Sequence, residues 1–164
     1  MISLLTLCFI HDGRRVLLIH RRKAPNAGRW DGVGGKLEPG EDPFAACLRE
    51  VYEETGLTVE SPQLRAVWVV VARDTGQIWM LYTFTAPVPV GEPVASDEGD
   101  LAWVDLDRLD DLPVMPDTRM VLPHVLGAAD VLTIREDLDT DDIDSMSRLE
   151  IIAPPARTAV LFQR

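Results

Sequence analysis

Three glutamates crowded onto one short segment could bind a divalent cation. Glu50, Glu53 and Glu54 follow Arg49 where the pattern predicts a helix. Residues three and four apart on a helix share a face, so Glu50 lies beside both other carboxylates. Such like-charge pairs cost about 0.2–0.5 kcal/mol each unless something positive neutralises them. Mg²⁺ and similar hard cations prefer carboxylate, carbonyl and water oxygens. The spacing therefore predicts a Mg²⁺ site, which Mn²⁺ could also occupy.

Local signals set the bounds of this helix. Asp42 is a good N-cap, and Pro43 suits the first helical position, where its missing N–H is no loss. Gly56 is placed to end the helix in a left-handed conformation. The helix should bury one apolar stripe, with the carboxylates opposite it or on its flank: Phe44, Leu48, Val51 and Thr55. The residues before the helix predict a tight loop that brings backbone groups close to a ligand: Gly34, Gly35, Pro39 and Gly40.

The segment 35–57 resembles the Nudix box, the signature of a superfamily that hydrolyses nucleoside diphosphates linked to another moiety. The match covers every defined position of the box: Gly35, Glu41, Arg49-Glu50-Val51, Glu53-Glu54 and Gly56-Leu57. A pattern with this many fixed positions is far more specific than a lone glycine-rich motif. The alternative is an ordinary amphipathic surface helix with solvated acids. The resemblance implies the Nudix fold, an α/β/α sandwich with a mixed β-sheet in the α+β class.

The resemblance also implies roles within the box. The backbone carbonyl of Gly35 would join the carboxylates of Glu50, Glu53 and Glu54 as a metal ligand. Arg49 would orient a box glutamate through a charge-assisted hydrogen bond.

Other positions would act structurally or lie outside the box. Glu41 would be the acid that ties the loop to the helix, and Gly56 would end the helix. Glu98 resembles an extra metal ligand or catalytic acid in relatives of the MutT type, and an exposed loop acid is the alternative. Spacing does not decide which glutamate is the general base, so the catalytic candidates are Glu50, Glu53, Arg49 and Glu98.

Composition narrows the classes of partner. A chain of 164 residues with 46% hydrophobic content is expected to form one globular domain, and a net charge of −11 argues against nucleic-acid polymers and anionic membranes as partners. Two cysteines without metal-type spacing, no signal peptide and no apolar run of membrane-spanning length indicate a reducing cytoplasm. Basic residues nevertheless gather before the box, and Lys23 and Lys36 could contact a triphosphate; a solvated basic face is the alternative.

The rest of the chain reads as mixed strands and helices. Strands are expected over 2–10, 15–21, 64–72, 77–86, 101–104, 131–135, 148–152 and 158–162, with a proline-rich loop over 87–94. Asp105 could cap a helical turn through Leu109. Asp117 could cap a helix towards Gly127, which Pro123 would kink or start later.

The final section, 131–164, has no assigned role. Its acidic run, EDLDTDDIDS, is expected to be a mobile, solvated loop. A calcium loop is excluded, because Asp142 stands at the position that needs glycine and Arg148 at the position that needs glutamate. The section could complete the sheet, cover the nucleotide pocket or mediate self-association, so a monomer and a homodimer are both open.

A wider resemblance, over roughly Ser3 to Leu126, points to the oxidised-purine nucleoside triphosphatases. These enzymes cleave 8-oxo-dGTP to the monophosphate and pyrophosphate, and they read the base with an asparagine and with paired aspartates after a tryptophan. Here Asp31 stands in place of the asparagine, Met115 in place of the tryptophan, and Asp117 is followed by Thr118. Ionised aspartates would accept from guanine N–H groups but could not donate to O6. Asp31 could instead be only a turn residue.

The favoured function is Mg²⁺-dependent hydrolysis of a purine nucleoside triphosphate such as 8-oxo-dGTP, in nucleotide-pool sanitation. The rival substrates are canonical triphosphates, dinucleoside polyphosphates and nucleotide sugars. A non-catalytic nucleotide-binding regulator is the alternative from another class, although its box would usually be degraded.

Overall fold

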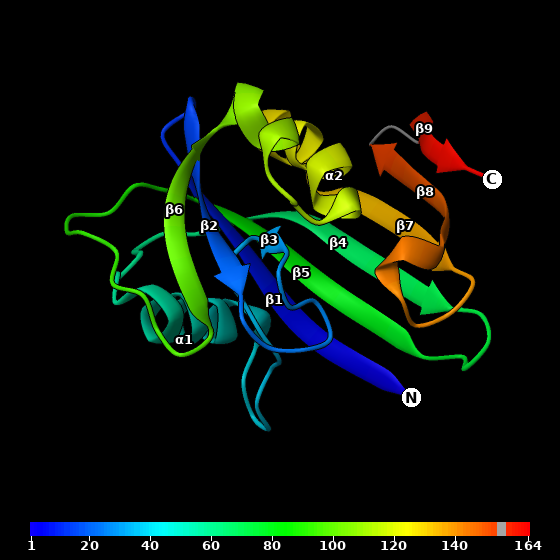
Figure 1. Cartoon of the computed structure of the whole chain (residues 1–164), viewed down its shortest axis with the longest axis horizontal. Helices are drawn as coiled ribbons and strands as arrows, with labels where there is room; N and C mark the ends of the chain where they lie inside the picture. The colour runs from blue at the N-terminus through cyan, green and yellow to red at the C-terminus, as the bar shows by residue number, and fades with distance from the viewer. Residues whose placement is uncertain (154–156) are drawn as a thin grey trace.

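The computed structural model describes residues 1–153 and 157–164, and Figure 1 shows their arrangement. Within these residues nine strands share one mixed sheet in the order β3-β2-β1-β5-β4-β7-β8-β9, with β6 paired to β2. The strands are β1 (Ile2–His11), β2 (Arg15–Arg21), β3 (Trp30–Asp31), β4 (Gln63–Ala72), β5 (Ile78–Pro87), β6 (Gly99–Asp105), β7 (Leu132–Leu138), β8 (Met146–Ala153) and β9 (Arg157–Gln163). The pairs β1–β5 and β4–β7 are parallel, and the other strand pairs are antiparallel.

Helices cover both faces of the sheet. The helices are α1 (Pro43–Thr55), α2 (Pro116–Gly127) and the 3₁₀ turns η1 (Leu106–Asp111) and η2 (Ile143–Ser145). Figure 1 shows α1 on one side of the sheet and α2 on the other. Cys47 and Val51 of α1 pack in one buried cluster, whereas Val121, Leu122 and Val125 of α2 pack in a second. The α+β sandwich implied by the resemblance is confirmed.

The predicted caps of α1 are present, but its buried stripe differs from the prediction. Asp42 accepts a hydrogen bond from the Ala45 N–H at 2.9 Å, and Gly56 has a φ of 71°. The predicted stripe was wrong at Phe44, which is 43% exposed. The buried residues of α1 are Ala46, Cys47, Val51, Glu54 and Thr55. Glu54 therefore faces inward, not on an exposed side of the helix.

The second helix starts where a proline allows it. Met115 precedes the helix and Pro116 occupies its first turn, so Asp117 lies inside the helix and is not the cap. Pro123 neither ends α2 nor delays its start, since the helix runs through it to Gly127. Pro123 lacks only the one N–H that would have bonded within the helix.

The C-terminal section completes the sheet, one of its three predicted alternatives. β7 pairs with β4, and the hairpin β8–β9 extends the edge beyond it. The prediction of a solvated acidic loop was wrong for Glu136 and Asp137, which belong to β7 and are 0% and 2% exposed. None of the helices in the described part of the chain has the length and hydropathy of a membrane span.

Candidate active site

One cleft of about 1000 Å³ brings most of the predicted site residues together. The predicted residues that line it are Asp31, Gly35, Lys36, Arg49, Glu50, Glu53, Glu54, Glu98, Met115 and Asp117. Glu41 and Gly56, which were assigned structural roles, do not line it. Lys23, which was predicted to contact the substrate, is not among the lining residues; its Nζ lies 2.5 Å from Oε1 of Glu98, which does line the cleft. The cleft thus joins the acids of α1 to the residues around the start of α2.

The glycine-rich loop lies directly against β1. The N–H of Thr6 donates to the carbonyl of Gly35 at 2.8 Å, and the N–H of Cys8 donates to the carbonyl of Val33 at 2.7 Å. A Cβ on Gly34 would lie 2.1 Å from the Thr6 carbonyl oxygen, so no larger residue fits there. The Gly35 carbonyl keeps a second lone pair for another partner.

Glu54 is buried beneath this loop. Its side chain is 4% exposed, and Oε2 accepts a hydrogen bond from the Gly34 N–H at 2.9 Å. Burial raises the pKa of Glu54 to about 7, the Gly34 hydrogen bond opposes the shift, and the charge of Glu50 adds to it.

Arg49 holds the remaining acids in place. Its Nε and Nη2 donate to the two carboxylate oxygens of Glu41 at 2.7 and 2.8 Å, and its Nη1 donates to Glu50 at 2.8 Å and to Glu53 at 3.3 Å. This contact lowers the pKa of Glu41 to about 2. Glu41 also accepts from the Glu38 N–H at 2.9 Å, so it links the loop to the helix.

The donor set suits a hard cation. Glu50 has a raised pKa, because burial and the charge of Glu53 outweigh the neighbouring Arg49. The Glu50 carboxylate also lies against the backbone of Gly35, so close that a Cβ there would meet Oε1 at 2.5 Å. Among the described residues no three acids, histidines or cysteines stand close enough together to enclose an ion. The fit therefore rests on the chemistry of oxygen ligands that gather at one end of the cleft.

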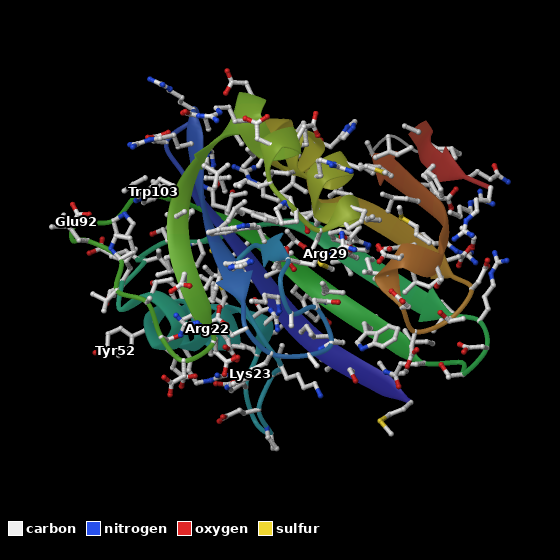
Figure 2. All side chains as sticks on the ribbon, viewed as in Figure 1. Arg22, Lys23, Arg29, Tyr52, Glu92 and Trp103 are labelled. Atoms are coloured by element: carbon white, nitrogen blue, oxygen red, sulfur yellow. The ribbon has the colours of Figure 1, made fainter. Side chains whose placement is uncertain are left out.

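Glu98 reaches the cleft from the loop before β6. Arg22 and Lys23, labelled in Figure 2, lie near this loop. Arg22 donates to Asp100 and to the Ser96 carbonyl, and Lys23 pairs with Glu98. Glu98 lines the cleft together with the box acids.

A second group of acids, from β3 and α2, lines the same cleft. Asp31 accepts hydrogen bonds from the Thr118 hydroxyl at 2.8 Å and from the Gly32 N–H at 2.7 Å. Asp117 is 9% exposed and Met115 is 4% exposed. Burial raises the pKa of Asp31, and burial with the charge of Asp31 raises the pKa of Asp117 to about 7.

The comparisons with known proteins agree with this geometry. The description of the NUDIX domain matches residues 4–125, about three quarters of the chain. The chain belongs to the Nudix family. The chain is 34% identical over 131 residues to the uncharacterized Nudix hydrolase YvcI of Bacillus subtilis, covering 77% of this chain and 81% of the relative. It is 31% identical over 150 residues to the mouse oxidized purine nucleoside triphosphate hydrolase, covering 90% and 95%.

A solved structure extends the likeness to the fold. The crystal structure of a MutT protein from Bacillus halodurans has a TM-score of 0.80 and 32% identity, and the match covers 94% of this chain and 99% of that one. This chain is therefore a Nudix hydrolase, a pyrophosphohydrolase. Nudix hydrolases act on small nucleotides and generally depend on a divalent metal.

Several residues of the Nudix cleft were not predicted from the sequence. Trp79, Leu81 and Val70 form part of the apolar floor, and Ile143 comes from the C-terminal section. Trp79 could have been suspected from its place in an aromatic strand, whereas Ile143 lies within the acidic run, which gave no such signal. The C-terminal section therefore contributes to the pocket as well as to the sheet.

Proposed function

We propose that this Nudix hydrolase cleaves purine nucleoside triphosphates, including oxidised ones such as 8-oxo-dGTP, to the monophosphate and pyrophosphate with Mg²⁺. One observation carries the proposal: the box acids and the buried pair Asp31 and Asp117 line a single cleft. A nucleotide can place its phosphates against the acids through the metal and its base against the aspartates. The names of the relatives in mouse and other organisms support the same substrate class.

At the phosphate end, the protein's part is to hold and orient charge. Glu50, Glu53, Glu54 and the Gly35 carbonyl would hold Mg²⁺, and Glu98 is the further candidate from outside the box. The bound metal would screen the phosphate oxygens, activate a water and stabilise the departing phosphate. Arg49 fixes Glu50 by the hydrogen bond at 2.8 Å, so that carboxylate is oriented before substrate arrives.

The order of burial suggests how the three box acids divide their work. Glu54 is buried and anchored by Gly34, whereas the Glu53 side chain is 57% exposed to the cleft. An anchored acid suits a fixed ligand, and an exposed one can reach a water or a second ion. Lys36 lines the same end, where a cation can contact phosphate oxygens.

Where the base would bind, the two carboxyl groups can accept hydrogen bonds from base N–H groups and, when protonated, can donate to a base oxygen. Asp117, with a pKa of about 7, is partly protonated at neutral pH. A protonated carboxyl can donate to a base oxygen, which an ionised aspartate cannot do. The loss of the relatives' asparagine at position 31 therefore does not remove the ability to contact a purine oxygen. Met115 can pack against the base in place of an aromatic side chain.

A turnover panel tests the proposal. With Mg²⁺ present, kcat/KM is measured for 8-oxo-dGTP, dGTP and dATP, and for a dinucleoside polyphosphate and a nucleotide sugar, while pyrophosphate and phosphate are followed separately. We expect kcat/KM to be highest for the purine triphosphates, and we expect pyrophosphate to be the product. Equal values for 8-oxo-dGTP and dGTP would exclude a dedicated sanitising role, and a lead for either of the other two substrates would overturn the proposal.

A matched pair of variants separates chemistry from folding. Glu53→Gln removes one charge at the phosphate end and should lower kcat by at least about a hundredfold with the fold retained. Glu92→Gln removes the same charge from an exposed loop, labelled in Figure 2, and should leave kcat unchanged. Wild-type turnover by Glu53→Gln would show that the metal assignment is wrong.

A further inference from the structure

The segment 139–145, which joins β7 to β8, reaches the cleft from outside the part of the chain that matches the NUDIX domain. That match ends at residue 125, whereas Asp141 and Ile143 of this segment line the cleft. Ile143 is the first residue of η2, and its partly buried side chain packs against the core cluster that also contains the buried side of α2. Figure 1 shows the segment in orange, and η2 lies against α2. The C-terminal section therefore supplies one wall of the cleft.

Hydrogen bonds within the segment fix its shape. The Ser145 hydroxyl accepts from the Thr140 N–H at 2.9 Å and donates to the Asp142 carbonyl at 2.6 Å. The Ser145 carbonyl accepts from the Asp139 N–H at 3.0 Å, which closes the segment into a loop. Side chains that bond to nearby backbone groups hold a turn in one conformation. The loop therefore presents Ile143 to the cleft in a defined position.

An ion pair attaches the loop to the residue before β3. Nη2 of Arg29, labelled in Figure 2, donates to the two carboxylate oxygens of Asp144 at 2.7 and 2.8 Å. Arg29 comes two residues before Asp31, and Asp144 directly follows Ile143. The two side chains are 30% and 60% exposed, and ion pairs this exposed contribute little to stability. The main effect of the pair is therefore to place Ile143 beside β3.

The floor of the cleft next to this loop is apolar. Val70 of β4 pairs with Trp79 of β5, and Ala72 of β4 pairs with Leu138 of β7. Residues in register on neighbouring strands face the same side of a sheet. Val70, Trp79 and Leu138 line the cleft together with Ile143. An apolar surface with a few polar groups beside it suits a heterocyclic base, whose edges can bond to the acids of β3 and α2.

We propose that Ile143 is a specificity-determining residue that packs against the base of the bound nucleotide, and that the ion pair between Arg29 and Asp144 positions it. The inference rests on the proposed function, because it requires the nucleoside to enter this cleft. Ile143 packs with α2, whereas the box acids belong to α1 on the other side of the sheet. Loss of Ile143 should therefore affect binding of the base and leave the reaction at the phosphates unchanged.

Binding and turnover of Ile143→Ala test this contact. In calorimetry with GMP and AMP, the variant should bind the tighter of the two on the order of tenfold more weakly, because roughly two methylene groups of apolar contact are lost. KM for the corresponding triphosphate should rise by a similar factor while kcat stays within about twofold of wild type. Inorganic pyrophosphate with Mg²⁺ has no base and should bind both proteins equally. Ile143→Val keeps most of the contact and should stay within about threefold of wild type.

Leu161→Ala is the matched control for stability. Leu161 of β9 is another partly buried residue of the C-terminal section and packs against the same core cluster, but it does not line the cleft. It should lower Tm about as much as Ile143→Ala and keep the wild-type affinity for the monophosphate. An equal loss of affinity in both variants would show that destabilisation causes the effect, and the inference would be overturned.

A double-mutant cycle tests the positioning role of the ion pair. Arg29→Gln and Asp144→Asn should each weaken monophosphate binding by about two- to fivefold, the range for exposed pairs, and the double variant should be no weaker than either. Asp111→Asn is the control, because it breaks an equally exposed pair with Arg108 that does not line the cleft, and it should keep the affinity. Additive losses, or wild-type binding by Asp144→Asn, would overturn the positioning role.

The outcomes separate this inference from the proposed function. If no triphosphate is hydrolysed but Ile143→Ala still weakens monophosphate binding, the proposed function fails and the inference holds. If triphosphates are hydrolysed and Ile143→Ala keeps the wild-type affinity and KM, the inference is overturned. It is overturned as well if neither monophosphate binds the wild-type protein, or if pyrophosphate binding falls as much as monophosphate binding. Should Ile143→Ala fail to fold, Ile143→Thr serves in its place, since it keeps the branch at Cβ and removes most of the apolar contact.

Discussion

Gly35→Ala should disable the phosphate end of the cleft while leaving the fold intact. Gly35 does not have a positive φ, so alanine can adopt its backbone conformation. A Cβ at this position would lie 2.5 Å from Oε1 and 2.6 Å from Cδ of Glu50, where ordinary contact begins at 3.4 Å. The Glu50 carboxylate must therefore move by about 1 Å, which disturbs its hydrogen bond with the Arg49 guanidinium. A displacement of this size at a reacting centre can cost on the order of a hundredfold in rate.

The assay compares kcat/KM with the thermal midpoint of unfolding. Gly35→Ala should lose about a hundredfold in kcat/KM while its Tm stays within about 4 °C of wild type, the shift caused by about 1 kcal/mol. Gly127→Ala is the control, because a Cβ at Gly127 meets nothing within 4 Å, and it should keep full activity. Activity of Gly35→Ala within about threefold of wild type would refute the packing of Glu50 against the loop. An equal loss of activity in Gly127→Ala would show that the loss is not specific to the contact between Gly35 and Glu50.

Three further predictions follow from the same contacts. Arg49→Lys should lower kcat by about tenfold or more and also lower Tm, because a lysine cannot reproduce the fork that binds Glu41 and Glu50 together; unchanged values in steady-state kinetics and thermal melts would contradict this. Asp117→Asn should flatten the pH dependence of the free energy of unfolding. Because the pKa of Asp117 is raised to about 7 in the folded protein, its protonated carboxyl contributes stability that is fully present below pH 4 and is lost as pH rises towards 7. The variant should therefore be the more stable protein at pH 8 in urea melts. EDTA should abolish turnover and excess Mg²⁺ should restore it, whereas Ca²⁺, which accepts looser geometry, should restore less.

Much of the fold around α1 could be predicted because its signals are local. Asp42 and Pro43 start the helix, and Gly56 ends it, whatever the rest of the chain does. The other strands were also predicted to within a few residues, since alternating and β-branched runs between turn residues need no tertiary information. The two-residue strand β3 (Trp30–Asp31) was not predicted. The start of α2 was missed by a few residues, because Asp117 and Pro116 both mark helix starts and only the structure shows that Pro116 comes first.

The predictions of burial that were wrong share one cause, which is that burial depends on contacts with distant parts of the chain. Periodicity assigned Phe44 to the buried stripe and put Glu54 outside it, yet Phe44 is exposed and Glu54 is buried. A pattern of hydrophobicity cannot show that an acid is buried when the group that compensates it comes from elsewhere in the chain. Glu136 was likewise read as part of a solvated loop, because β7 exists only once β4 offers its edge as a parallel partner.

Glu54 and the glycine loop are best understood as one unit. The Gly34 N–H reaches Glu54 only because the loop lies against β1, with the Thr6 carbonyl occupying the space where a Cβ of residue 34 would be. Without this close approach Glu54 would be a buried acid with no donor, and it would be expected to move outward or to stay protonated. A glycine is therefore required at position 34 mainly so that its N–H can reach Glu54, and the loop and the helix form one structural unit. It follows that the electrostatics of the phosphate end depend on a main-chain contact as much as on the glutamates themselves.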